Sequence, residues 1–118
     1  MGRNLALGAM GEALAAERLT ASGMRILDRN WRCRHGELDL VAVDGDTVVF
    51  VEVKTRSGLG FGSPAEAVTY AKQRRIRMLA QRWLSESERH WPHVRFDVVS
   101  VLVDRRRDPE VTHLVAVF

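Results

Sequence analysis

The sequence predicts an α/β fold in which a mixed sheet of about five strands is flanked by helices. Segments of helical and strand character follow one another along the 118 residues in the order α-β-β-β-α-β-β. Apolar runs such as VVFVEV are typical of a strand whose two faces are both covered. Neither a repeat nor a linker interrupts the chain, so we expect a single domain over residues 1–118.

The beginning of the chain predicts one helix and one strand. Residues 4–22 are rich in alanine and leucine and predict a helix that ends at Gly23. Residues 25–33 (RILDRNWRC) predict the first strand. At about 100° per residue, the helix has one small apolar face with Glu12 at its centre, so we expect Glu12 to point toward the sheet. That face comprises Leu5, Gly8, Ala9, Ala15, Ala16 and Leu19.

The segments GELDLVAV and TVVFVEV predict a hairpin, because Asp44-Gly45 between them suits a tight turn. Alternate strand residues share a face, so Glu52 and Lys54 face one side, and a turn of two or four residues places Asp39 on that side as well. A four-residue turn would place Asp39 opposite Glu52, and a two-residue turn would place the two diagonally. Either register brings two carboxylates and one ammonium together, whereas a three-residue turn would separate them.

The second half of the chain predicts a helix followed by two strands. Ser63-Pro64-Ala65-Glu66 is typical of a helix start, with serine as the N-cap, proline at the first position and glutamate completing a capping box. We expect this helix to reach about Ser87, because Pro92 prevents its continuation. Residues 94–103 and 111–118 predict the last two strands.

Charge favours a polyanionic partner. The net charge is +3 and the isoelectric point about 9.7. Taken alone, clusters of arginine are nevertheless more often solvated surface than nucleic-acid contacts. Sixteen of the eighteen basic residues are arginine, and the two lysines, Lys54 and Lys72, lie at positions that the strand and helix patterns mark as buried. The ammonium of a lysine is a compact charge, and its pKa can shift with its surroundings, whereas the guanidinium of an arginine stays charged.

Two interpretations of the predicted carboxylate patch are open. Burial costs several kcal/mol for each unpaired ion. A structural salt-bridge cluster would pair Glu52 with Lys54, and Glu12 with an arginine. A site for Mg²⁺ or Mn²⁺ would neutralise the carboxylates directly. We favour the metal site, because Mg²⁺ binds through one or two carboxylates together with water and substrate phosphate.

Asp39 followed by Glu52-Val53-Lys54 resembles the motif of the PD-(D/E)xK nucleases, although Leu38 stands where the motif has proline. The leading helix with Glu12 resembles that of the archaeal Holliday-junction resolvases in the same superfamily. The stretches GELDLVAVDGDTVVFVEVKTR, FGSPAEAV and RFDVVSV are together similar to the YraN-like family of uncharacterised bacterial proteins. These resemblances imply a restriction endonuclease-like fold and metal-dependent phosphodiester hydrolysis.

The resemblance implies a role for each motif residue. Asp39 and Glu52 would bind Mg²⁺ or Mn²⁺ through their side chains, and Val53 would bind it through its carbonyl. Glu12 would complete or orient the site, directly or through water. Lys54 would position the attacking water, accept its proton or stabilise the transition state, and the sequence leaves these three roles open.

Three further residues are candidate nucleic-acid contacts. Lys72 falls within the apolar stripe of the second predicted helix, where both a phosphate contact and a side chain whose stem packs along the surface are expected patterns. Gln73 is a weaker candidate, suggested by the glutamine that related nucleases often carry in a following helix. Arg56 begins the glycine-rich loop and could hold a backbone phosphate, although an ordinary connector fits this position equally well.

The expected setting is the cytoplasm. Cys33 is the single cysteine, so no internal disulfide can form, and no apolar run approaches the roughly 18 residues that span a membrane. We expect a nucleic-acid partner, DNA in preference to RNA, and no membrane. Cleavage of symmetric branched DNA would need two sites and so a homodimer. The alternatives are a non-catalytic nucleic-acid-binding module and a subunit that is active only with a DNA repair or recombination partner, such as a helicase or polymerase.

Overall fold

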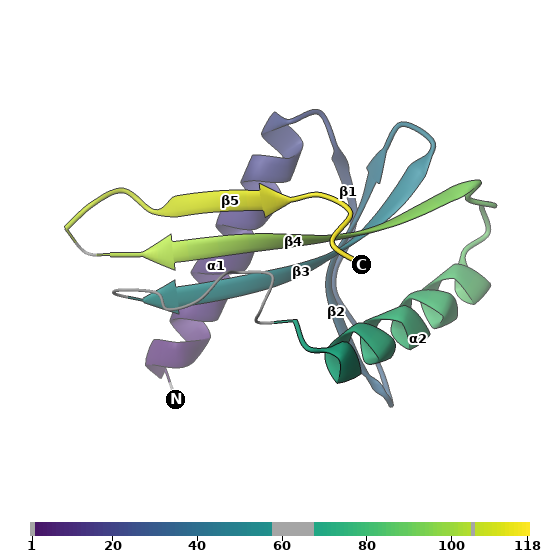
Figure 1. Ribbon diagram of the computed structural model, residues 1–118, viewed down its shortest axis with the longest axis horizontal. Helices are drawn as coiled ribbons and strands as arrows, with labels where there is room; N and C mark the ends of the chain where they lie inside the picture. The colour runs from purple at the N-terminus through teal and green to yellow at the C-terminus, as the bar shows by residue number, and fades with distance from the viewer. Residues whose placement is uncertain (1, 58–67, 105) are drawn as a thin grey trace.

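The computed structural model describes residues 2–57, 68–104 and 106–118, with side chains from residue 6 onwards. Figure 1 shows two helices and five strands in the predicted order, so the predicted mixed α/β fold is confirmed. None of the described helices is long and apolar enough to cross a membrane. The elements are α1 (Gly2–Ala21), β1 (Arg25–Cys33), β2 (Gly36–Asp44), β3 (Thr47–Ser57), α2 (Tyr70–Glu86), β4 (His93–Val103) and β5 (Glu110–Leu114).

The five strands form one sheet in sequence order, β1-β2-β3-β4-β5. Neighbouring strands are antiparallel except for β3 and β4, which run parallel over eleven paired positions. A parallel pair requires a crossover, and α2 supplies it between these two strands. The strand β3 therefore lies at the centre of the sheet. In Figure 1, β1 and β2 are rotated steeply relative to β3, β4 and β5, as the twist of a sheet requires.

The two helices cover opposite faces of the sheet, so β3 is buried on both sides. On one face, Val49 and Val51 pack with the residues of α1, and on the other, Val48 and Phe50 pack with those of α2. This arrangement explains why the strand is apolar in every position from 48 to 51. Since alternate residues share a face, Glu52 and Lys54 continue the row that faces α2.

The hairpin between β2 and β3 turns at Gly45 and Asp46. Val43 pairs with Val48, which is the register expected of the four-residue turn, but Asp44 also pairs with Thr47 and shortens the loop to two residues. The diagonal alternative is therefore wrong. Gly45 has a φ of 64°, in the left-handed region that glycine adopts at little cost. Continued along the strands, this register places the two carboxylates of the predicted motif opposite one another.

The helix α2 begins later than the sequence predicts. Val68 and Thr69 are not helical, and the helix starts at Tyr70, with the Thr69 hydroxyl accepting a hydrogen bond from the backbone N–H of Lys72 at 3.2 Å. The predicted start at residues 63–66 lies outside the described residues. Val68 is 4% exposed and belongs to the core beneath α2. The burial of this valine brings the chain to the sheet just before the helix begins.

The last strand is shorter than predicted, ending at Leu114 rather than at residue 118. The backbone N–H of Ala116 instead donates to the carboxylate of Asp97 at 2.9 Å, and that of Val117 donates to the Phe96 carbonyl at 2.8 Å. A carboxylate buried on β4 thus diverts the end of the chain from the sheet.

The carboxylate of Asp97 is fully buried and fully partnered. Arg95 donates to both of its oxygens at 2.9 Å and forms an ion pair with it, and His113 lies 2.7 Å away. Burial alone would raise the pKa of Asp97, but the hydrogen bonds from Arg95, Ala116 and His113 hold it below its usual value.

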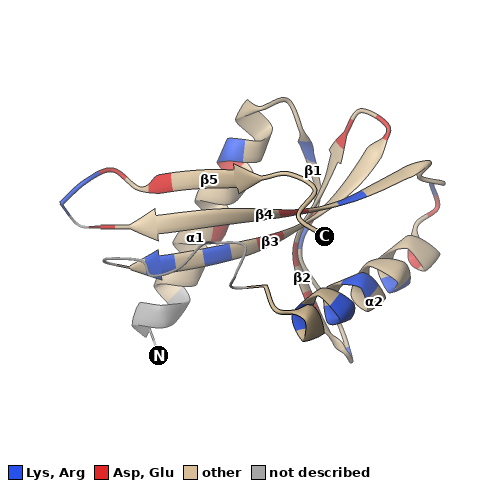
Figure 2. Ribbon diagram, viewed as in Figure 1, with Lys and Arg blue, Asp and Glu red and all other residues tan. Residues whose placement is uncertain are grey.

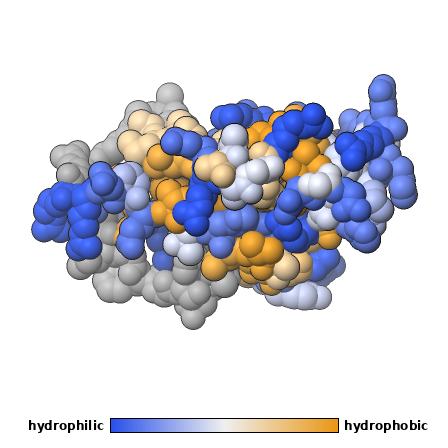
Figure 3. All heavy atoms as spheres, turned by 90° about the horizontal axis from the view of Figure 1, so that it is seen from above, coloured by the Kyte–Doolittle hydropathy of each residue, from blue (hydrophilic) through white to orange (hydrophobic). Residues whose placement is uncertain are grey.

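On the face seen from above in Figure 3, hydrophobic patches are interrupted by hydrophilic side chains.

The helix α1 approaches the sheet closely at Gly11. A Cβ atom at this position would overlap the side chain of Thr55 on β3, so only glycine allows the observed contact. Ala15, Ala16 and Leu19 are buried as predicted, but Ala9 is exposed and Gly11 takes its place on the packed face. The side chain of Leu5 lies outside the described part of the chain.

Candidate functional site

Two carboxylates from neighbouring strands line one hollow beside α2. Asp39 on β2 and Glu52 on β3 share a hollow of about 290 Å³ with Lys72 and Arg75 of α2. Figure 2 shows the acidic positions of these strands in red and the basic residues along α2 in blue. The structure thus brings together residues that lie more than thirty positions apart in the chain.

Asp39 lies where the pairing between β2 and β3 ends. The last paired residues are Leu40 and Val51. The next backbone N–H of β3 that points toward β2 belongs to Val53, and it donates to Oδ2 of Asp39 at 2.9 Å. In an extended strand the N–H and C=O of one residue point to the same side. The Val53 carbonyl therefore faces the same edge as Asp39, as a joint role in binding a cation would require.

The ionised form of Asp39 is unfavourable in these surroundings. Burial raises the pKa of Asp39 to about 7, and the charge of Glu52 contributes to the rise, whereas the hydrogen bond from Val53 opposes it. Glu12 and Glu37 add smaller increases to the same pKa. A cation placed among these carboxylates would favour the ionised form.

Two lysines supply positive charge to Glu52. The ammonium of Lys72 lies 2.7 Å from Oε1 of Glu52, and that of Lys54 lies 3.8 Å from the same atom. Burial and the neighbouring Lys72 lower the pKa of Lys54. Burial alone would lower the pKa of Lys72 too, but its hydrogen bonds to Glu52 and Lys54, together with the charges of Glu52 and Asp39, raise that pKa above its usual value. Lys54 is therefore the lysine that gives up its proton more readily.

Glu12 approaches the patch from the opposite face of the sheet. Its side chain is half-buried on α1, one residue after the close contact of Gly11 with β3, and its charge raises the pKa of Asp39. Within residues 6–57, 68–104 and 106–118, no three Asp, Glu, His or Cys side chains lie close enough to hold one metal ion. The role of Glu12 as a metal ligand stays a prediction.

The donor atoms at the patch suit a hard divalent cation. Asp39 and Glu52 offer carboxylate oxygens and Val53 offers a carbonyl oxygen, the ligand types that Mg²⁺ and Mn²⁺ prefer. Mg²⁺ commonly keeps several waters, so two carboxylates are sufficient protein ligands. The pKa of Asp39 is raised, as expected where the neighbouring positive charge does not balance the carboxylates.

The other predicted contacts occupy different positions. Arg56 lies on β3 in the same alternating row as Glu52 and Lys54, and it is half-buried. Gln73 donates from its side-chain amide to the Val68 carbonyl at 3.2 Å. This hydrogen bond gives Gln73 a local role at the start of α2.

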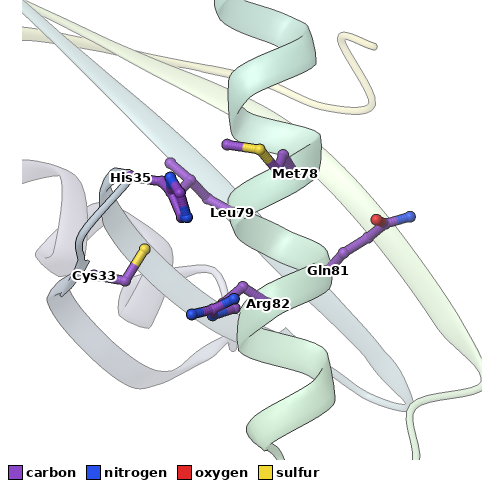
Figure 4. A pocket seen from close by; sticks show the side chains of 6 residues that line it. All are labelled: Cys33, His35, Met78, Leu79, Gln81 and Arg82. Carbon is purple, nitrogen blue, oxygen red and sulfur yellow. The ribbon is translucent and has the colours of Figure 1, made fainter.

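A second hollow lies beside the first along α2. It has a volume of about 300 Å³ and shares Leu79 with the hollow that contains the carboxylates. In Figure 4, Cys33 and His35 approach it from the turn between β1 and β2, while Leu79 and Arg82 extend toward them from α2. The two hollows together form a groove between α2 and this turn.

Comparison with known proteins places the chain in a family. The model of the uncharacterised protein family UPF0102 matches residues 11–101. The chain belongs to this family. A UPF0102 protein of Rhodococcus opacus (strain B4) is 62% identical over 114 residues, which cover 97% of each chain. One of Nocardia farcinica (strain IFM 10152) is 59% identical over 118 residues, covering 100% of this chain and 93% of the relative.

The UPF0102 family model matches a part of the chain that includes all the candidate site residues named above, namely Glu12, Asp39, Glu52, Val53, Lys54, Arg56, Lys72 and Gln73. Sequence reasoning missed Arg75, which lines the same hollow. Its spacing provided a signal, because residues three apart on a helix are neighbours and Arg75 follows Lys72 by three. Arginine clusters are typical of a solvated surface, so the sequence alone did not mark Arg75 as part of the site.

Proposed function

We propose that this UPF0102 protein is a metal-dependent nuclease that hydrolyses phosphodiester bonds in nucleic acid, with branched or damaged DNA as its expected substrate. The observation that carries the proposal is the meeting of Asp39 and Glu52 at one hollow, with Lys54 beside them and Lys72 at the rim. Opposed carboxylates with an adjacent lysine of lowered pKa form a combination that suits hydrolysis.

Asp39, Glu52 and the Val53 carbonyl would hold Mg²⁺ or Mn²⁺, and Glu12 would orient the site through water. The metal would lower the pKa of a bound water and stabilise negative charge on the phosphate. Lys54, whose pKa is lowered by burial and by Lys72, would accept a proton from the attacking water.

The positive charges of α2 suit the binding of the substrate. Lys72 and Arg75 line the same hollow as the carboxylates and could contact the phosphates on either side of the reacting one. An overall charge of +3 is also compatible with a polyanion.

Cleavage of labelled oligonucleotides tests this proposal. The substrates are a four-way junction, a linear duplex and a single strand, each with Mg²⁺, Mn²⁺ or EDTA. We expect cleavage that needs the metal and falls by roughly 100-fold or more in Asp39→Asn and in Lys54→Met. The control is Asp46→Asn, which removes the same charge from the exposed hairpin turn. Cleavage that persists in Asp39→Asn, or no cleavage of any substrate, would overturn the proposal.

A non-catalytic nucleic-acid-binding module is the second candidate, and one observation favours it. The ammonium of Lys72 lies 2.7 Å from Glu52, so the protein itself supplies a cation that neutralises this carboxylate. Such a module would bind nucleic acid in EDTA, with an affinity that falls steeply with salt and is unaffected by Glu52→Gln. The same substrates distinguish the candidates, because the module binds them without cleaving them.

A further inference from the structure

The groove along α2 continues well beyond the carboxylates. Its first hollow contains Asp39, Glu52 and Arg75, its second contains Cys33 and Arg82, and Leu79 lines both. Arg75 and Arg82 lie seven residues apart on the helix, about 10 Å along its axis.

The rim of the groove carries positive charge that is available to a ligand. Arg75 is exposed, and among the described residues it has no acidic partner. Within the part of the chain that the structure describes, the one ion pair of Arg82 is a distant contact with Glu86, at 4.0 Å, between side chains that are both more than half exposed. Exposed pairs of this kind contribute little, so both guanidinium groups could turn to phosphate oxygens at small cost.

Apolar side chains form part of the floor of the groove, beside the polar His35 and Gln81 of its second hollow. Leu79 is buried beneath both hollows, Met78 is 47% exposed and lines the second, and Cys33 lies on the opposite wall. The bases of a duplex are stacked on one another, so a duplex would present phosphates, sugars and base edges to this surface but not the faces of its bases. A single strand can direct its phosphates to the rim and the apolar faces of its bases to the floor.

We infer that this groove binds a short single-stranded nucleic-acid segment and leads it toward Asp39 and Glu52. The inference deepens the proposed function and rests on it for the role of the two carboxylates. It specifies the substrate class as nucleic acid with a single-stranded stretch beside the cleaved bond, such as a flap or an opened branch. Arg75 and Arg82 are the residues that contact its phosphates.

Binding of a fluorescently labelled oligo-dT 12-mer in EDTA tests the inference, with anisotropy as the readout. We expect the double variant Arg75→Gln/Arg82→Gln to lose at least tenfold in affinity. The control is Arg74→Gln/Arg106→Gln, which removes two positive charges from outside the groove and should lose less than threefold. Equal losses in the two double variants would overturn the inference, because they would show that positive charge anywhere on the surface, and not the groove, attracts the oligonucleotide.

The single cysteine provides a second readout in the unaltered protein. Cys33 is half-buried in the groove, so saturating 12-mer should slow its reaction with a maleimide at least fivefold. A labelling rate that does not change at saturation would overturn the inference. Neither measurement involves cleavage or a metal. A failure of the nuclease proposal would therefore appear in the cleavage assay alone, and a failure of the groove would appear here.

Discussion

The ammonium of Lys72 lies 2.7 Å from Oε1 of Glu52, so a side chain of α2 neutralises a carboxylate of the central strand β3. The side chains are 24% and 13% exposed, so solvent screens their attraction only in part. Glu52 is also one of the two carboxylates that would hold a divalent cation. Lys72 and a metal ion are therefore competitors for the same oxygen atoms.

Replacement of Lys72 by methionine should tighten metal binding. The variant keeps a long apolar stem but leaves Glu52 without its nearest cation, so we expect the affinity for Mn²⁺ to rise by roughly tenfold, or about 1.4 kcal/mol. Calorimetric titration measures this change. Arg74→Gln removes one positive charge from outside the hollow and serves as the control. Equal affinities in wild type and Lys72→Met would show that the two cations do not compete.

Metal binding should also depend on pH. Because the pKa of Asp39 is raised to about 7, this ligand must release a proton when a cation binds near neutral pH. We expect the affinity for Mn²⁺ to fall by up to tenfold per unit as the pH drops below 7, and to level off above it. Titrations at pH 6, 7 and 8 measure this dependence, and Asp39→Asn should abolish binding. An affinity that is constant over this range would contradict the assignment of Asp39.

The metal-free protein should become more stable when Asp39 is replaced by asparagine. The folded state raises the pKa of this carboxyl from 3.8 to about 7, so it binds the proton more tightly than the unfolded state does. The wild-type free energy of unfolding therefore falls as the pH rises from about 4 to 7. Asparagine does not ionise and can still accept the hydrogen bond from the Val53 N–H.

Thermal unfolding in EDTA measures this effect. We expect Asp39→Asn to exceed the wild type by on the order of 1–2 kcal/mol at pH 8 and to match it near pH 4. Asp46→Asn, on the exposed turn of the same hairpin, should change little at either pH. A variant less stable than the wild type at pH 8 would mean that the ionised carboxylate is well accommodated without a cation.

Two glycines of α1 should respond oppositely to alanine. In Gly11→Ala the new Cβ overlaps the side chain of Thr55, so we expect a loss of roughly 1–3 kcal/mol. In Gly8→Ala the Cβ meets nothing within 4 Å, so the higher helix propensity of alanine should add roughly 0.5–1 kcal/mol. Denaturant unfolding of both variants measures the difference. Similar stability in the two would show that α1 does not approach β3 as closely as described.

Local rules of the chain are sufficient to predict much of the fold. The strand period of two places Glu52 and Lys54 on one face, whatever the rest of the structure does. Asp44, Gly45 and Asp46 define a hairpin, and a hairpin makes its two strands neighbours. The order of the elements follows from the same local patterns, and it is the order observed.

Other features depend on residues that are distant in the sequence. The start of α2 follows from the burial of Val68, and the early end of β5 follows from hydrogen bonds to Asp97. A capping sequence or an apolar run predicts neither, because tertiary contacts outweigh weak local preferences.

The sequence by itself determined which residues form strands and helices, and that Glu52 and Lys54 share a face. Only the tertiary structure decided that Lys72 lies on Glu52, that Gly11 lets α1 approach β3, and that Arg75 joins the carboxylates. The reason is physical. Periodicity along one element gives the direction of a side chain, whereas the identity of its partner depends on how the helices pack across the sheet.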